Sequence, residues 1–248
     1  MQHTIALGNR LLAALPKADV ESLGPLRRVP LERDAVLVQP GYPAQQIHFP
    51  CSGMVAFMME MPNGQAAATA VTGNDGISGM LLSLGPVPSP ITAVVRVPGT
   101  AWQISPAQFN AALRRRRAIR AMVLTFARTL LVQLQHVAVC NALHSVEERM
   151  ATWLLRMHDQ VEGDVVPVTQ DAIAELLGVR RTTVTLAALK LKEAGAIRSH
   201  GRGSIKIDRK RLEAASCQCY ELMSHRINGI VSQHGIKISQ SPRADWLG

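Results

Sequence analysis

The chain has 248 residues, of which 47% are hydrophobic and 18% are charged. These fractions are those of an ordinary globular protein and exclude a disordered or fibrous chain. No apolar run reaches the roughly 20 residues that span a bilayer, and the N-terminal residues lack the basic region and cleavage site of a signal peptide. We therefore expect a cytoplasmic protein that has no membrane partner.

Positive charge is concentrated in the second half of the chain. The 27 lysines and arginines exceed the 18 aspartates and glutamates by 9. Residues 1–110 contain six basic and six acidic side chains, whereas residues 178–211 contain ten basic and two acidic ones. This asymmetry indicates a module that binds a polyanion, joined to one that does not. A solvated basic surface without a partner is the alternative.

After a short helix expected over residues 5–15, residues 26–104 have the pattern of an antiparallel β-domain. Turn-forming sequences such as Pro62-Asn63-Gly64 and Pro98-Gly99 separate short segments rich in Val, Ile and Thr. Many short strands with regular turn signals are typical of a barrel or jelly roll. The expected strands are Ala35–Gln39, Gln46–Phe49, Met54–Met59, Ala67–Val71, Ile91–Val97 and Ala101–Ile104.

A capped helix is expected from Ser105-Pro106, followed by a long helix over residues 116–143. Apolar residues in the long helix recur at alternating spacings of four and three, which is the pattern of a coiled-coil seam. The predicted seam, with one polar member, consists of Ile119, Val123, Phe126, Leu130, Gln133, Val137 and Cys140. A second stripe is expected to pack against the β-domain, and it consists of Met122, Leu124, Leu131 and Leu134.

Two apolar faces on one helix indicate that it lies between its own domain and a partner subunit. We therefore predict a homodimer, the alternative being a monomer in which this helix is buried. Arg114–Arg117 are interpreted as a solvated helix start. A further helix is expected over Val146–His158.

Residues 168–195 read VTQDAIAELLGVRRTTVTLAALKLKEAG and predict two short helices joined by a tight turn. Thr169 suits the N-cap of the first helix, and Gly178 supplies the positive φ that ends it. The second helix, expected over about residues 180–194, has a basic start. This is a helix-turn-helix arrangement, whose second helix enters the major groove of DNA. An ordinary helical hairpin is the alternative.

A wing is expected after the second helix, because Ile197–His200 and Ser204–Ile207 read as two strands around Arg202. A closing helix over residues 209–224, capped by Asp208, and a C-terminal tail follow. Arginine bonds guanine bidentately, and threonine contacts thymine methyls or phosphates. The predicted DNA-binding residues are Thr169, Arg180, Arg181, Thr182, Thr183, Thr185, Lys190, His200 and Arg202.

The segment TQDAIAELLGVRRTTVTLAALKLKEAGAIRSHGRGSIKI resembles the DNA-binding end of the Crp–Fnr (catabolite-activator-like) family of bacterial transcription regulators. The β-rich region is similar to that family's cyclic-nucleotide-binding-like jelly roll. The resemblance implies an α+β chain with a jelly-roll sensor domain (1–115), a dimerisation helix (116–143), a winged helix-turn-helix domain (144–224) and a tail (225–248). It also implies a homodimer on a palindromic site in double-stranded DNA, with RNA polymerase as a partner at promoters.

On this resemblance, Thr169 and Thr183 match phosphate contacts, and Arg181 matches a guanine-reading arginine. Thr182 stands where many members have glutamate, and Leu186 where they have a second arginine. Neither residue can reproduce those base contacts, so we expect an operator that differs from the family consensus.

The sensor domain lacks the residues that hold a cyclic nucleotide in this family. The resemblance requires a Gly-Glu pair for the ribose and an arginine for the phosphate. The matching stretch begins at Asp75-Gly76, and no arginine lies between Arg33 and Arg96. Leu134 and Gln135 stand where hydroxyl residues would meet the purine. A cyclic phosphate would lose its charge-assisted contact, so we expect no tight binding of cyclic AMP or cyclic GMP, and the signal remains unknown.

No cofactor or metal is expected. Only Cys51 precedes residue 140, so the thiolates of an Fnr-type iron–sulfur cluster are not available near the N-terminus. Cys217-Gln218-Cys219 is interpreted as structural or incidental, the alternative being a redox or metal-sensing thiol pair. The β-rich region also lacks the clustered histidines of a metal-dependent cupin, so we expect no enzyme activity.

These patterns together predict a sequence-specific transcription regulator. The alternatives are a dimeric scaffold that does not bind DNA and a β-barrel protein that binds a small ligand. A steep fall of DNA affinity with salt distinguishes the regulator from both.

Overall fold

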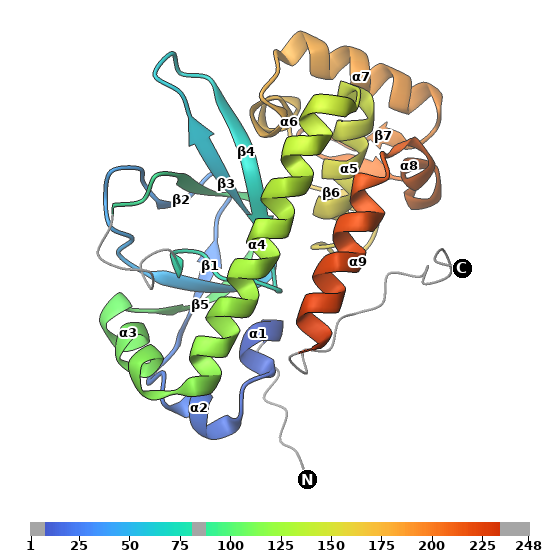
Figure 1. Cartoon of the computed structure of the whole chain (residues 1–248). Helices are drawn as coiled ribbons and strands as arrows, with labels where there is room; N and C mark the ends of the chain where they lie inside the picture. Colours follow the sequence, from blue (N-terminus) through green and yellow to red (C-terminus); the bar gives the residue numbers. More distant parts are fainter. Residues whose placement is uncertain (1–7, 81–87, 234–248) are drawn as a thin grey trace.

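The computed structural model describes residues 8–80 and 88–233. An antiparallel β-domain, a long central helix and a C-terminal helical domain with a small sheet follow one another along the chain (Figure 1), which confirms the predicted fold class. The β-domain and the central helix comprise α1 (Arg10–Ala13), α2 (Lys17–Glu21), β1 (Arg27–Leu31), β2 (Val36–Val38), β3 (Ile47–Glu60), β4 (Ala66–Thr72), β5 (Thr92–Ile104), α3 (Pro106–Arg115) and α4 (Arg117–Leu143). The C-terminal part comprises α5 (Val146–His158), β6 (Val165–Val166), α6 (Gln170–Leu177), α7 (Arg181–Glu193), β7 (Ile197–Ser199), β8 (Ile205–Ile207), α8 (Arg209–Ala215) and α9 (Cys219–Ser232).

The β-domain is built on two long strands, where the sequence predicted four short ones. β3 and β5 pair antiparallel over most of their length, and β1, β2 and β4 complete the sheet. The predicted break at Pro98-Gly99 is a bulge inside β5. Gly99 lies so close to Ser52 that a Cβ would stand 2.2 Å from the Ser52 carbonyl oxygen, and Gly53 has a φ of +77°. The two glycines therefore let the strands bend while they remain paired.

The predicted turn at Pro62-Asn63-Gly64 is confirmed as the hairpin between β3 and β4. The N–H of Met61 donates to the carbonyl of Gln65 over 2.8 Å. Strand β1 was not predicted, because Pro30 and two arginines obscure its alternation; it pairs with the far end of β5.

Among the described residues, the N-terminal helix is shorter than the predicted 5–15, and residues 5–7 of that prediction lie outside the described part of the chain. α1 begins after Asn9, whose side chain accepts from the N–H groups of Leu11 and Leu12. The same side chain is buried and donates to the carbonyls of Pro50 and Gly76, which ties α1 to the β-domain.

For most of their residues, the two apolar faces of α4 are the reverse of the prediction, although Met122 is buried in the β-domain core as predicted. Ile119, Val123 and Phe126 of the predicted seam are buried in the chain's own β-domain core. Gln133 is buried as well. Its side-chain oxygen, Oε1, accepts hydrogen bonds from the Val71 N–H at 3.1 Å and from the Arg156 guanidinium, which satisfy this polar atom inside the protein. The remaining seam residues, Leu130, Val137 and Cys140, also pack against their own chain.

The exposed apolar stripe of α4 contains three residues that were assigned to the β-domain. Leu124, Leu131 and Leu134 are 58%, 56% and 43% exposed. These three residues are spaced by seven and three positions, so they fit a heptad repeat just as the predicted seam residues do. Spacing alone therefore does not determine which apolar face of the helix packs against the β-domain. Among the described residues, α4 is the one helix with the length and apolarity of a membrane span.

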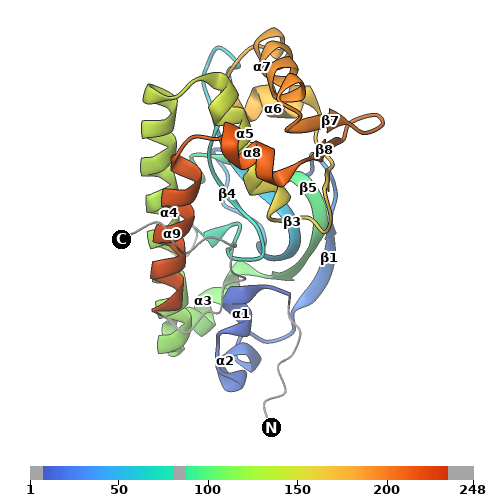
Figure 2. The ribbon, with the colours of Figure 1, turned by 90° about the vertical axis from the view of Figure 1, so that its right-hand side faces the viewer.

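The closing helix predicted over residues 209–224 is two helices. Ser216 adopts an extended conformation that ends α8, and the chain turns before α9 begins at Cys219. α9 lies beside α4 in both views (Figures 1 and 2), and buries Tyr220, Met223 and Val231. This helix crosses residue 224, where the tail was expected to begin.

The helical domain packs on the outer face of the sheet. Alternate residues of β3 point to opposite sides: Val55 and Phe57 belong to the β-domain core, whereas Met54, Ala56 and Met58 share a core with the helical domain. One face of β3 is covered by the β-domain core and the other by the helical domain, and this explains why the strand is apolar on both faces.

Candidate DNA-binding surface and sensor cavity

The helix-turn-helix is formed by local signals that the sequence predicted. The Thr169 hydroxyl caps α6 by accepting from the Ala172 N–H at 3.1 Å. Gly178 ends the helix in the left-handed conformation, with a φ of 65°, which favours glycine. The buried face of α7 consists of Val184, Ala187, Ala188 and Leu191. The opposite face of α7 is consequently turned to solvent.

The first residues of α7 are presented at the surface. Arg180, Arg181, Thr182 and Thr185 are exposed, and Thr183 is half-buried. Lys190 is exposed two turns further along. Leu186, also exposed, lies one turn from both Thr182 and Lys190 on the outward face.

Acidic and polar neighbours hold several of these side chains. Arg181 Nε lies 3.4 Å from Asp171 Oδ1, and both side chains are more than 60% exposed. Lys190 pairs with Glu147, and the Thr185 hydroxyl donates to Gln170 at 3.1 Å. An exposed ion pair contributes about 0–1 kcal/mol. The arginine can therefore exchange its carboxylate for a DNA group at little cost.

The predicted wing is formed by β7 and β8, which project from the helical domain (Figure 2). Gly201 and Gly203 both have positive φ and flank Arg202, which is exposed at the tip. His200 stands at the base of the tip, where its backbone N–H donates to the Ser204 carbonyl over 3.1 Å.

A groove of about 300 Å³ lies between the start of α6, α7 and the wing. Of the predicted residues, Thr169 and Arg181 line it. Lys192 and Arg198 line it too and were not among the predicted contacts. Arg198 lies on β7 beside the buried Ile197, and this alternation would have predicted that Arg198 faces outward.

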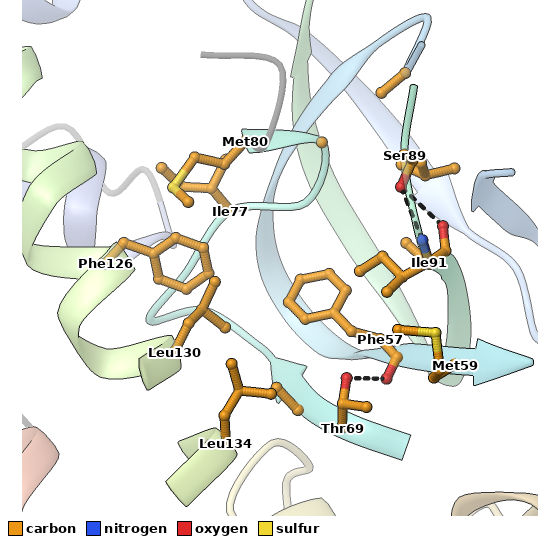
Figure 3. Close-up of a pocket in the computed structure, with 15 residues that line it drawn as sticks. Phe57, Met59, Thr69, Ile77, Met80, Ser89, Ile91, Phe126, Leu130 and Leu134 are labelled. Atoms are coloured by element: carbon orange, nitrogen blue, oxygen red, sulfur yellow. Dashed lines mark hydrogen bonds between the residues drawn. The ribbon is translucent and has the colours of Figure 1, made fainter. Parts of the chain in front are cut away.

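The β-domain contains an apolar cavity of about 240 Å³ against α4 (Figure 3). Phe126, Leu130 and Leu134 of α4 form one wall, and Phe57 and Met59 of β3 lie across from them. None of the described residues that line the cavity is charged.

The two hydroxyl groups that the described residues bring to the cavity wall are already hydrogen-bonded within the chain. Thr69 donates to the carbonyl of Phe57 at 3.0 Å, and Ser89 donates to the carbonyl of Ile91 at 2.8 Å (Figure 3). Among the described residues, the cavity wall therefore offers neither a cation for a phosphate nor a free polar group for a ribose.

An ionic contact between Arg96 and Glu175 joins the two domains. The Arg96 guanidinium of β5 bonds Asp34 at 2.8 Å and pairs with Glu175 of α6. Arg96 is buried, whereas its two carboxylate partners are exposed.

Four residues could hold a metal ion, although no metal site was predicted. Cys140, His144, Cys217 and Cys219 have ligand atoms within 4.8 Å of one another. A hydrogen bond with the Cys140 thiol lowers the pKa of Cys217 below that of an ordinary thiol. The signal was distributed over Cys-x₃-His and Cys-x-Cys pairs more than 70 residues apart, and each pair by itself is weak evidence.

Two family models match successive parts of the chain. Residues 28–116 match the cyclic nucleotide-binding domain, and residues 148–215 match the Crp-like helix-turn-helix domain. No curated protein matches the chain in sequence.

Solved structures share the fold. FixK2 from Bradyrhizobium japonicum is 17% identical, with a TM-score of 0.66 over 78% of this chain and 98% of that protein. The Crp/Fnr-family regulator TTHA1359 from Thermus thermophilus is 21% identical, with a TM-score of 0.61 over 79% and 98%. A putative cAMP-binding regulatory protein from Silicibacter pomeroyi is 25% identical, with a TM-score of 0.56 over 85% and 95%.

The β-domain, which matches the first model, and the recognition helix, which matches the second, thus lie on either side of the long helix α4 in the chain. The chain belongs to the Crp–Fnr family of transcriptional regulators and carries its DNA-binding helix-turn-helix domain.

Proposed function

We propose that this regulator binds a palindromic DNA site as a homodimer and that an uncharged, apolar small molecule controls it from the β-domain cavity. The outward-facing, basic start of α7 beside the groove is the observation that carries the proposal. We assign the protein to the cytoplasm, where its operator and RNA polymerase would be its partners, and we assign it no enzymatic activity.

The groove supports contact with the DNA backbone. Arg181, Lys192 and Arg198 bring three cations to its wall, and Thr169 adds a hydroxyl at the N-terminus of α6. Cations, hydroxyls and helix N-termini are the groups that bind phosphates and set a protein's register on DNA. With α7 in the major groove, Arg202 at the wing tip would reach the flanking backbone.

The exposed stripe of α4 supports the homodimer. Leu124, Leu131 and Leu134 continue toward Ala138, which is also exposed, so that small and large apolar residues occupy heptad positions. A two-fold axis along this stripe pairs each leucine with its copy. Two recognition helices on one rigid dimer then read half-sites about one helical turn apart.

Leu134 supports coupling between the signal and the dimer. This side chain lines the cavity and also belongs to the exposed stripe. A ligand that displaces Leu134 changes the dimer contact directly. An apolar cavity of about 150 Å³ holds benzene, so 240 Å³ accommodates a somewhat larger apolar molecule.

Selection of bound sequences from random duplex DNA tests the DNA-binding part of the proposal. We expect an inverted repeat whose half-sites are centred about 10 base pairs apart. The affinity for the selected site should fall steeply as salt is raised, because several phosphates are neutralised. A selected pool without two-fold symmetry, or an affinity that is insensitive to salt, would overturn it.

Two measurements test the signal. Native mass spectrometry of the purified protein should find any co-purified ligand to be uncharged and apolar. Isothermal titration with cyclic AMP or cyclic GMP should give no binding, and micromolar affinity for either nucleotide would contradict the assignment.

A further inference from the structure

A compact cluster of three thiols and one imidazole lies where α4 ends and α9 begins. Cys140 and His144 are one turn apart at the C-terminus of α4. Cys217 lies in the break between α8 and α9, and Cys219 is the first residue of α9. The three cysteines are buried, and His144 is half-buried.

The spacing of these atoms fits a single tetrahedral ion. The two sulfur atoms of Cys140 and Cys217 are 3.5 Å apart, and the Cys219 sulfur is 3.6 Å from His144 Nδ1. A zinc ion with bonds of about 2.3 Å to sulfur places its ligand atoms about 3.8 Å from one another. All four ligand atoms lie within 4.8 Å of each other. A disulfide would require two sulfur atoms at about 2.05 Å and would leave the other two groups without a role.

We propose that Cys140, His144, Cys217 and Cys219 bind one zinc ion, which fastens α9 to the end of α4. Three thiolates and one imidazole form a closed donor set of the kind found in structural zinc sites. The thiol protons leave to solvent as the metal binds.

The surroundings support a metal-bound thiolate cluster. The Thr152 hydroxyl lies 3.2 Å from the Cys217 sulfur, within reach for an outer-shell hydrogen bond. Three thiolates and Zn²⁺ carry a net charge of −1. The buried guanidinium of Arg156, which interacts electrostatically with Cys140, partly offsets this charge. A small cavity lined by Cys140, Cys219 and Asn141 adjoins the site and provides a route for the ion.

The proposal also explains the break between α8 and α9. A continuous helix over residues 209–224 would place Cys217 and Cys219 about 200° apart around its axis. The non-helical run from Ser216 to Gln218 instead brings both sulfur atoms to the same ion. The end of α4, which leads into the DNA-binding domain, and α9, which follows that domain, are thereby joined at one point.

Elemental analysis of the full chain, purified without chelators or supplied with zinc, is the primary test. We expect one zinc ion per chain. Cobalt substitution should produce a thiolate charge-transfer band and the strong visible bands of tetrahedral cobalt. Cys217→Ser and Cys219→Ser should each weaken zinc binding at least tenfold. Cys51→Ser is the matched control, because Cys51 lies in the β-domain away from the cluster, and it should bind zinc normally.

Thermal unfolding separates loss of metal from loss of fold. Zinc should raise the melting temperature of the wild type and of Cys51→Ser, but not that of His144→Ala, whose fold can be checked by circular dichroism. The proposal is wrong if all cysteines react as free thiols in the presence of excess zinc, if Cys140 and Cys217 form a disulfide, or if Cys51→Ser also loses the metal. None of these measurements involves DNA, so their failure would leave the proposed regulator function intact.

Discussion

Arg181 carries the most specific part of the proposed DNA contact. It is the first residue of α7, it is exposed, and its partner Asp171 holds it at the rim of the groove. Its guanidinium can donate two parallel hydrogen bonds to guanine O6 and N7. Thr182 and Leu186 lie on the same outward face and have no such geometry. Discrimination by arginine is therefore expected at one base pair of each half-site.

Arg181→Ala should lower affinity for the selected operator by about 1–3 kcal/mol per half-site and relax specificity at one base pair. Binding assays on the operator and on its single-base variants measure this effect. Arg115→Ala, which removes an exposed arginine far from the helix-turn-helix, is the control and should leave the pattern unchanged. Unaltered base preference in the Arg181 variant would refute the assignment.

His48 is a second residue with a measurable signature. It is buried in β3, and its Nε2 lies 3.1 Å from the Gln103 amide nitrogen. Burial lowers the pKa of His48 to about 4. The folded protein therefore keeps this imidazole neutral at a pH where the unfolded chain, with a pKa of about 6.5, binds a proton.

Stability should consequently fall as pH is lowered from about 6.5 to about 4, because only the unfolded state takes up the proton in that window. The contribution of His48 to this loss is about 3 kcal/mol at most. Urea unfolding across this range measures it. His48→Gln should flatten the dependence, whereas His225→Gln, at an exposed position of α9, should not. A wild-type stability that is constant between pH 6.5 and pH 4 would argue against a neutral His48.

At the scale of elements, α4 is the helix with two tasks. One face completes the core of the β-domain through Ile119, Val123 and Phe126. The other face exposes Leu124, Leu131 and Leu134. A substitution on each face should therefore have a different consequence.

Leu131→Glu should convert the proposed dimer to monomers while leaving the fold intact, because the side chain is 56% exposed in the single chain. Two-fold symmetry would place both carboxylates close together in the apolar seam, and we expect the dimer dissociation constant to rise at least tenfold. Analytical ultracentrifugation measures this change. Leu222→Glu, at an exposed leucine of α9, should leave the dimer unchanged.

The opposite face provides the counter-test. Ile119→Ala should cost about 2–5 kcal/mol of unfolding free energy and leave the association of the folded protein unaffected. If Ile119→Ala weakens the dimer and Leu131→Glu does not, the originally predicted seam is the interface and the stripe on α4 is not.

The helix-turn-helix could be predicted from sequence because its determinants are local. The Thr169 cap, the Gly178 turn and the alternation in the wing all act within a few residues. The orientation of α4 could not be predicted in this way, because both of its faces are apolar and long-range contacts decide which is buried. Gln133 illustrates the difficulty: its partners Val71 and Arg156 belong to other elements. The cysteine cluster was missed for the same reason.

At the scale of the whole molecule, the helix-turn-helix domain rests on the sheet through an apolar contact and an ionic one. Met54, Ala56 and Met58 of β3 contribute to the shared core, while Arg96 joins Asp34 to Glu175 at its edge. The recognition helix faces solvent in this arrangement. Any change in the relative orientation of the two domains must disturb both contacts.

Arg96→Met should loosen this domain contact while preserving the apolar part of the side chain. The loss of charge-assisted hydrogen bonds is worth about 1–3 kcal/mol, and both carboxylates left behind are exposed to water. Hydrogen exchange should become faster in α6 and β4, and the fold of each domain should persist. Arg27→Met, at an exposed arginine of β1, is the control. Equal hydrogen-exchange rates in Arg96→Met and Arg27→Met would show that the ionic contact does not hold the two domains together.

In the proposed regulator, the double role of Leu134 links self-association of the chain to occupancy of the cavity by a ligand. If occupancy strengthens pairing of the chains, thermodynamic reciprocity requires paired chains to hold the ligand more tightly by the same factor. The concentration of the protein in the cell would then itself control ligand occupancy, because dilution of the protein would release the ligand. Depletion of the ligand would likewise separate the subunits. A titration of ligand affinity against protein concentration would reveal this reciprocity without any DNA present.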